Sequence, residues 1–298
     1  MDYPDFEIII LPDETFPDNK LPSTNIPIKV ISTGQVSPAQ KRDMALTHAK
    51  GEILAFIDDD SFPGKDWLKN ALVLFEGNNN VAAVGGPAVT PPNDSFVQRA
   101  SGNTYSSMAV SGTYIYRYVP KKMQEVDDYP TCNFLVRKSV MQELGGFKTK
   151  FWPGEDTKLC LEITKKLGKK IIYDPKVLIY HHRRPLFLPH LRQIASYALH
   201  RGYFVKKYPQ TSLRLPYFLP TIFLFAVITG GILSIFSTYF KKIYFWGLSF
   251  YLLLVLLFSI SRELRQIPLV FLGIISTHLT YGFYFLRGLI VKRLKEET

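Results

Sequence analysis

Two groups of carboxylates in the chain have residue types and positions suited to catalysis. Asp58-Asp59-Asp60 directly follows the apolar run Ile53–Ile57, and Gly154-Glu155-Asp156 precedes a segment with helical periodicity. Adjacent carboxylates repel by about 1 kcal/mol per close pair even in water, so a divalent cation is their natural companion. The two groups together predict a metal-bound diphosphate leaving group at the first and proton removal from a hydroxyl at the second.

Each group also has an ordinary structural explanation. A solvated acidic turn accounts for Asp58-Asp59-Asp60 as well as a metal site does, and N-capping accounts for Asp156 taken alone. If the first group does bind a metal, its oxygen ligands suit a hard cation, which predicts Mg²⁺ or Mn²⁺.

The elements that must position these residues read as an α/β domain with a sheet. Ser37, Pro38 and Gln40 predict a capped helix start, and Gly51 is expected to end that helix. The apolar run Ile53–Ile57 is expected to be covered on both faces, with its acidic end at the ligand-binding edge of the sheet. Further strands are expected at residues 6–11, 28–31, 81–84, 134–136, 171–173 and 177–180, helices at 66–77, 140–144 and after 154, a loop at 87–92, and an unassigned insertion at 93–128.

The last third of the chain predicts a membrane region. The 298 residues include three stretches without charge, each close to the roughly 20 residues that cross hydrocarbon. A buried pair of soluble helices is the alternative. We expect an α/β domain at 1–208 and transmembrane helices within 209–298, at about 215–240, 243–261 and 266–286.

Charge and cysteine content indicate which partners and which cellular compartment the chain is suited to. The net charge of +11 favours anionic headgroups or phosphorylated substrates, and no motif for nucleic-acid binding accompanies it. Only two cysteines are present and a disulfide framework is not expected, which predicts a first domain in the cytoplasm. Since nothing at the amino terminus resembles a signal peptide, membrane targeting is expected from the carboxyl-terminal helices, as in a multi-pass protein of the cell membrane. Orientation stays open: cations before the first span place that domain inside, but three crossings would put Lys292, Arg293 and Lys295 outside, unless one segment is re-entrant or interfacial.

The order of motifs from Tyr3 to Arg184 resembles the family-2 inverting glycosyltransferases of GT-A fold. The resemblance is carried by Tyr3-Pro4-Asp5-Phe6-Glu7, by Lys41-Arg42-Asp43 with Ala49-Lys50-Gly51-Glu52, by Asp58-x-Asp60, by Leu144-Gly145-Gly146-Phe147 and by Gly154-Glu155-Asp156. Members of the family carry a strand and a helix ahead of the first of these motifs, so we expect an amino-terminally incomplete domain.

The resemblance assigns roles to particular residues. It implies that Asp156 is the general base, with Glu155 beside it in the catalytic pair. It places the nucleotide sugar against Asp13, Lys41, Arg42, Asp58 and Asp59, and the metal on Asp60, Asp58 and His182. Arg183 and Arg184 are expected to meet phosphates of a lipid-linked acceptor.

The resemblance also implies the reaction. We expect inverting transfer of one sugar from a nucleotide-diphosphate sugar to a hydroxyl of a lipid-linked or cell-surface glycan. The carboxyl-terminal motif His278-Leu279-Thr280-Tyr281-Gly282 resembles exopolysaccharide transferases, and the Gln-x-x-Arg-Trp motif of processive synthases is absent. The alternatives are a processive synthase and a catalytically impaired membrane remnant that serves as an interaction partner.

Overall fold

The computed structural model describes residues 3–17, 21–261 and 263–297. It consists of two compact units. Unit 1 comprises Met1–Ala88, Pro120–Tyr180 and Lys295–Thr298, and unit 2 comprises Val89–Val119 and His181–Leu294. The predicted domains 1–208 and 209–298 divide the chain elsewhere, and their outermost residues 1–2 and 298 lie outside the described part.

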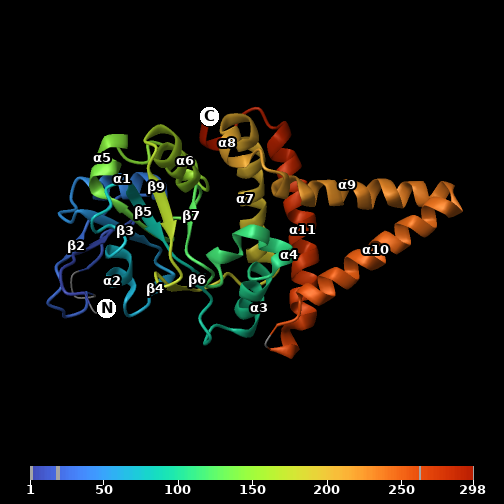
Figure 1. Ribbon diagram of the computed structural model, residues 1–298, viewed down its shortest axis with the longest axis horizontal. Coiled ribbons are helices and arrows are strands. Elements are labelled where there is room, and N and C mark those ends of the chain that lie inside the picture. The colour runs from blue at the N-terminus through green and yellow to red at the C-terminus, as the bar shows by residue number, and fades with distance from the viewer. Residues whose placement is uncertain (1–2, 18–20, 262, 298) are drawn as a thin grey trace. The chain divides into compact units, whose positions relative to one another are not determined.

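Unit 1 is built on strands, which Figure 1 shows among the blue to yellow-green ribbons. A mixed sheet has the order β3-β8-β5-β9-β7, in which only the β5–β9 pair is parallel. A parallel pair β1-β2 and a small sheet β4-β10-β6 complete the strands. Their bounds are β1 Ile8–Ile10, β2 Ile28–Val30, β3 Ile53–Ile57, β4 Ser61–Pro63, β5 Val81–Gly85, β6 Ala88–Val89, β7 Gln124–Val126, β8 Asn133–Arg137, β9 Lys170–Tyr173 and β10 Ile179–His181.

The core of unit 1 forms where strands alternate their side chains between two faces. Leu135 of β8 packs in one apolar cluster with Trp67 and Leu68 of helix α2. Its neighbours Phe134 and Val136 are equally buried but point to the opposite face. The predicted burial of β3 on both faces is wrong, because β3 is the edge strand of its sheet and Ile57 stays 38% exposed.

The helices of unit 1 follow the predicted starts more closely than the predicted ends. Ser37 caps α1 in a complete capping box with Gln40, as predicted, but the helix ends at Leu46, before Gly51. The other helices are α2 Trp67–Leu72, α5 Lys138–Leu144, α6 Glu155–Leu161 with a π-helical continuation η3 Glu162–Lys166, and the short η5 Lys295–Glu297. Helix α5 ends at Gly145 in the left-handed conformation that glycine favours. Both cysteines, Cys132 and Cys160, are free.

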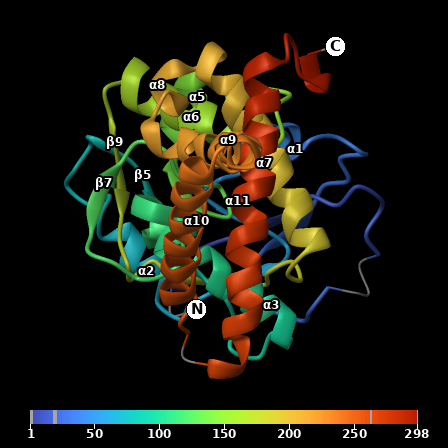
Figure 2. The same ribbon diagram turned by 90° about the vertical axis from the view of Figure 1, so that its right-hand side faces the viewer.

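Unit 2 is helical. The predicted loop at 87–92 contains β6, which reaches this unit, and the unassigned insertion begins with helices of unit 2. The helices are α3 Phe96–Tyr105, α4 Met108–Ser111, η2 Gly112–Arg117, α7 Leu188–Lys207, α8 Pro209–Ser212, α9 Leu215–Phe236, α10 Thr238–Phe258, η4 Leu264–Gln266 and α11 Ile267–Ile290. Helix α11 packs along α7, while α9 and α10 leave and return as a long hairpin (Figures 1 and 2).

Three helical segments are long and apolar enough to cross a membrane, which confirms that prediction by length and composition. They are Leu215–Phe236, Thr238–Phe258 and Leu264–Glu297. The predicted boundary between the first two is displaced. Lys241 and Lys242 were expected to separate the spans, but they lie within the first two turns of α10, and the helices part at Ser237.

Candidate active site

The acidic run after β3 contributes to a group of possible metal ligands. Oxygens of Asp58 and Asp60 and a ring nitrogen of His181 lie within 4.8 Å of one another. Strand β10, which begins in unit 1 and is hydrogen-bonded to β4, carries His181 as its last residue. Asp59 is exposed and is not part of this group.

The histidine in this group differs from the predicted one. His182 was the predicted metal ligand, whereas the structure brings His181 to the two aspartates. Successive side chains of an extended chain point to opposite sides, so only one of two adjacent histidines can face them. The Nδ1 atom of His182 instead contacts the buried carboxylate of Asp94.

Arg42 of α1 connects the two acidic motifs. Its Nη2 donates to Asp58 Oδ1 at 3.1 Å, and its Nη1 donates to Glu155 Oε1 at 2.9 Å. The Arg42 side chain is 13% exposed and that of Glu155 is 6% exposed. The guanidinium also lies 5.9 Å from the Phe56 ring centroid and 5.8 Å from that of Phe147. A charge-assisted pair in such surroundings is screened little by solvent, so Arg42 holds both motifs in one place.

Two other predicted nucleotide-binding residues form a pair with each other. Lys41 Nζ makes an ion pair with Asp13 and also donates to the carbonyl of Leu11 at 3.0 Å. The Asp13 side chain is 51% exposed, so this pair is open to solvent. The structure thus places Arg42 and Lys41, neighbours on one helix, in contact with different carboxylates.

Asp43 is a structural residue to which the sequence analysis assigned no role. Its carboxylate accepts hydrogen bonds from the backbone N–H of Phe147 at 2.7 Å and of Lys148 at 3.2 Å. Burial raises the pKa of Asp43 above its usual value, and these two hydrogen bonds act in the opposite direction. A Cβ at Gly146 would meet the carboxylate at 2.3 Å, which explains the glycine there. The sequence offered two hints of this contact, because Asp43 belongs to the motif that contains Arg42, and Gly145-Gly146 belongs to another motif of the same family.

The second acidic motif occupies the first turn of α6. Gly154 is the N-cap residue with a φ of 118°, so Glu155 and Asp156 are already helical and neither is the N-cap. Glu155 is buried and its second carboxylate oxygen accepts from the N–H of Gly154 at 3.1 Å. Asp156 is half-buried and accepts from the N–H of Thr157 at 2.7 Å. Both carboxylates lie in the first turn of α6, where the partial positive charge of a helix start favours acidic side chains.

In this group of possible metal ligands the two carboxylates suit a divalent cation, whereas the imidazole of His181 already accepts a hydrogen bond from Arg183. Asp58 and Asp60 offer hard oxygen ligands. Arg183 donates to Nδ1 of His181 at 2.9 Å, and a guanidinium has no acceptor, so Nδ1 carries the lone pair and the neutral ring carries its hydrogen on Nε2. For His181 to bind a cation through Nε2, the ring must therefore change tautomer and release Arg183.

Arg183 is placed differently from the prediction that it meets acceptor phosphates. It is 7% exposed, donates to Thr90 Oγ1 at 3.2 Å, and stacks over the rings of Tyr105 and Tyr118. Arg184 is exposed.

Comparison with known proteins agrees with the motifs. Residues 1–145 match the model of the family described as Glycosyl transferase family 2. Glucosyl-dolichyl phosphate glucuronosyltransferase of Haloferax volcanii is 25% identical over 138 residues, which cover 44% of this chain and 43% of that protein. Pre-mycofactocin glycosyltransferase of Mycobacterium tuberculosis is 28% identical over 149 residues, 49% of this chain and 30% of that protein. The chain thus matches less than half the length of these curated relatives.

A solved structure shows the same fold. The mannosyltransferase PcManGT from Pyrobaculum calidifontis, solved with GDP-Man and Mn²⁺, aligns with a TM-score of 0.59 at 17% identity, over 98% of this chain and 81% of that one. The α/β GT-A-like fold predicted from the sequence is confirmed. Residues 1–145 are thus similar to Glycosyl transferase family 2 domains, and the named relatives that match the chain are glycosyltransferases.

Proposed function

We propose that this protein transfers a single sugar, with inversion, from a nucleotide-diphosphate sugar to a hydroxyl of a lipid-linked or cell-surface glycan. The observation that carries the proposal is the contact of Arg42 with both Asp58 and Glu155. Through it, α1 ties the acidic end of β3 to the start of α6 in a domain of glycosyltransferase class. The guanidinium of Arg42 therefore holds both sets of carboxylates that the chemistry requires.

The chain's own residues have distinct tasks in this reaction. Asp58 and Asp60, with His181 after its change of tautomer, would hold Mg²⁺ or Mn²⁺, which would neutralise charge developing on the diphosphate. Asp156 accepts the proton of the acceptor hydroxyl. The hydroxyl oxygen then bonds to the anomeric carbon as the bond from that carbon to the diphosphate breaks. Attack from the side opposite the leaving group inverts the configuration.

The remaining predicted nucleotide contacts form the donor side of this proposal. Asp13 and Asp59 are exposed and can meet a base or ribose without losing a buried partner. Lys41 can exchange its exposed ion pair with Asp13 for a phosphate at low cost, since such pairs are worth at most about 1 kcal/mol. Arg42 is committed to two carboxylates, so its contribution is to position them.

A lipid-linked acceptor is supported by the relative named for action on a glucosyl-dolichyl phosphate and by the apolar helices of unit 2. These helices motivate placing the protein in the cell membrane with its catalytic residues in the cytoplasm. Transfer of one sugar follows from the missing Gln-x-x-Arg-Trp motif. A role in exopolysaccharide synthesis belongs to the same proposal.

The test is transfer by the full chain in detergent. UDP- and GDP-sugars would be supplied with Mn²⁺ and with a glucosylated dolichyl phosphate, whose sugar offers the acceptor hydroxyls. We expect acceptor-dependent release of nucleoside diphosphate, a product larger by one sugar in mass spectrometry, and a reversed anomeric configuration in NMR. Product chains of many sugars, or retention of the anomeric configuration, would contradict the proposal. Failure of every donor to release its nucleoside diphosphate would contradict it as well.

A further inference from the structure

The three apolar helices of unit 2 differ in how far the protein covers them. In the most apolar stretch of each helix, only 6% of the residues are buried in α9 and 6% in α10, against 33% in the segment that contains α11. Large apolar side chains of the first two face outward, as Ile235 and Trp246 do at 78% exposure each. Such surface is costly in water and requires an apolar neighbour.

Helices α9 and α10 form a pair whose length suits a bilayer. Tyr244 packs against Gly230, where a Cβ would meet its ring at 2.7 Å, and the rings of Phe223 and Tyr251 stack at 4.1 Å. At about 1.5 Å per residue, the 22 residues of α9 span about 33 Å, which matches a hydrocarbon core of about 30 Å.

Helix α11 is fixed to helices of a different character. Gly202 of α7 and Gly288 of α11 cross so closely that a Cβ at either would meet backbone of the other helix at 2.2 Å. A buried relay adds polar contacts: His190 of α7 joins Thr277 of α11 at 3.0 Å and Ser101 of α3 at 2.9 Å. Helix α11 therefore cannot enter a bilayer without α7.

Helix α7 is unsuited to hydrocarbon, because it exposes Arg192, Lys206 and Lys207. Direction gives a second argument. Figure 1 shows α9 running crosswise to α7 and α11, and in Figure 2 α9 is seen along its axis while α11 stands upright. If α9 runs along the bilayer normal, α7 and α11 lie along the surface.

We infer that α9 and α10 cross the lipid bilayer as a two-helix hairpin, and that α11 stays at the membrane surface with α7. This arrangement removes the conflict in the distribution of charge. Cations before α9 and after α10 now share one side, and these include Arg214 and Lys292. The far side receives only Lys241 and Lys242 from the hairpin, as the excess of positive charge on cytoplasmic segments requires.

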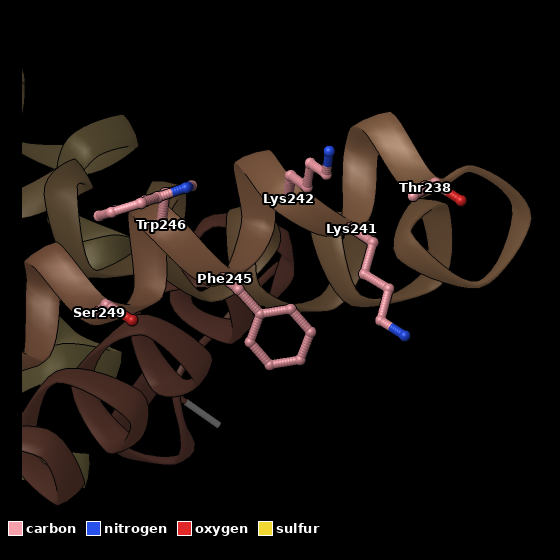
Figure 3. Close-up of a pocket in the computed structure, with 6 residues that line it drawn as sticks. All are labelled: Thr238, Lys241, Lys242, Phe245, Trp246 and Ser249. Atoms are coloured by element: carbon pink, nitrogen blue, oxygen red, sulfur yellow. The ribbon is translucent and has the colours of Figure 1, made fainter.

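The tip of the hairpin has the composition of a membrane interface. One side of α10 forms an open hollow of about 490 Å³ lined by Thr238, Lys241, Lys242, Phe245, Trp246 and Ser249 (Figure 3). The two lysines extend from the helix beside the turn, where their ammonium groups can reach headgroup phosphates. Phe245 and Trp246 follow one turn further along the helix, where aromatic rings meet the acyl chains.

The test maps the sides of the membrane with cysteines in the full chain. Glu143→Cys on α5, Thr238→Cys at the hairpin turn and Lys292→Cys after α11 are exposed positions, and the parent with its two natural cysteines sets the background. A membrane-impermeant polyethylene-glycol maleimide is added to sealed inverted vesicles and to spheroplasts of the expressing bacterium. Labelling is counted by gel shift before and after detergent, so it does not depend on transferase activity.

We expect Glu143→Cys and Lys292→Cys to react together in inverted vesicles and Thr238→Cys to react only in spheroplasts. If Lys292→Cys reacts with Thr238→Cys instead, α11 is a third span. If Thr238→Cys reacts from the same side as Glu143→Cys, the hairpin does not cross. Recovery of the chain as a soluble oligomer would show that a second copy covers the hairpin, which also overturns the inference.

Discussion

Replacing Arg42 by methionine tests whether one buried cation holds the site together. Methionine keeps an unbranched apolar stem but cannot donate, so Glu155, with a side chain 6% exposed, loses its ion-pair partner. Removing one member of a buried pair typically costs about 3–5 kcal/mol. For a domain of this size that corresponds to a Tm lower by about 6–20 °C. We expect this loss in thermal melting followed by tryptophan fluorescence, together with loss of sugar transfer.

A second substitution separates this explanation from ordinary loss of packing. In the background of Arg42→Met, Glu155→Met removes the stranded carboxylate, and we expect much of the lost Tm to return while activity stays absent, because replacing a whole buried pair by apolar groups is often neutral. Lys41→Met is the matched control on the same helix. Its exposed pair with Asp13 predicts a change of at most about 1 kcal/mol. Additive losses from Arg42→Met and Glu155→Met would refute the coupling.

Four further outcomes are expected. Asp156→Asn should lower turnover by about 10²–10⁴ while calorimetry shows unchanged donor binding, and a change of only a few-fold would deny it the role of base. Chelation should abolish donor binding and Mn²⁺ restore it; binding that persists in chelator would exclude the metal. Arg183→Gln should tighten Mn²⁺ binding, since Nδ1 of His181 is then released, and weaker binding would contradict the tautomer argument. Burial lowers the pKa of His190 to about 4, so the unfolded chain binds more protons below pH 6.5 and Tm should fall between pH 6.5 and 4; His190→Gln should flatten that profile.

Signals from neighbouring residues predicted where helices and strands begin. Contacts between residues far apart in the sequence determined how exposed those helices and strands are. The capping box of Ser37 and Gln40 depends on residues three apart, so sequence alone could place the start of α1. The exposure of β3 depends on which strands pair with it, and the partner β8 lies some eighty residues away. The run Ile53–Ile57 is apolar at every position, and periodicity cannot distinguish a covered strand from an edge strand in such a run.

The site shows the same division. Adjacent His181 and His182 are the same residue type, and the sheet in which β10 lies beside β4 ends with His181 near the aspartates. Arg42 was predicted to bind the nucleotide sugar, and the structure places it against Asp58 and Glu155. Its partners could not be found, because Glu155 lies 113 residues away and its burial emerges only when α1 and α6 pack.

The hairpin turn explains why charge was a poor guide to the boundary between the first two apolar helices. Lysines near a helix end keep their charge in water by extending long side chains, so they do not interrupt a helix. The backbone is interrupted at Ser237, whose φ of −151° and ψ of 127° are extended rather than helical. Since the break precedes Lys241 and Lys242, both belong to the returning helix and mark the depth of the far headgroups. In this arrangement Lys241 and Lys242 are the cations of the hairpin that lie on the far side of the membrane, against a larger number on the cytoplasmic side. The excess of positive charge on the cytoplasmic side is therefore satisfied without α11 crossing the membrane.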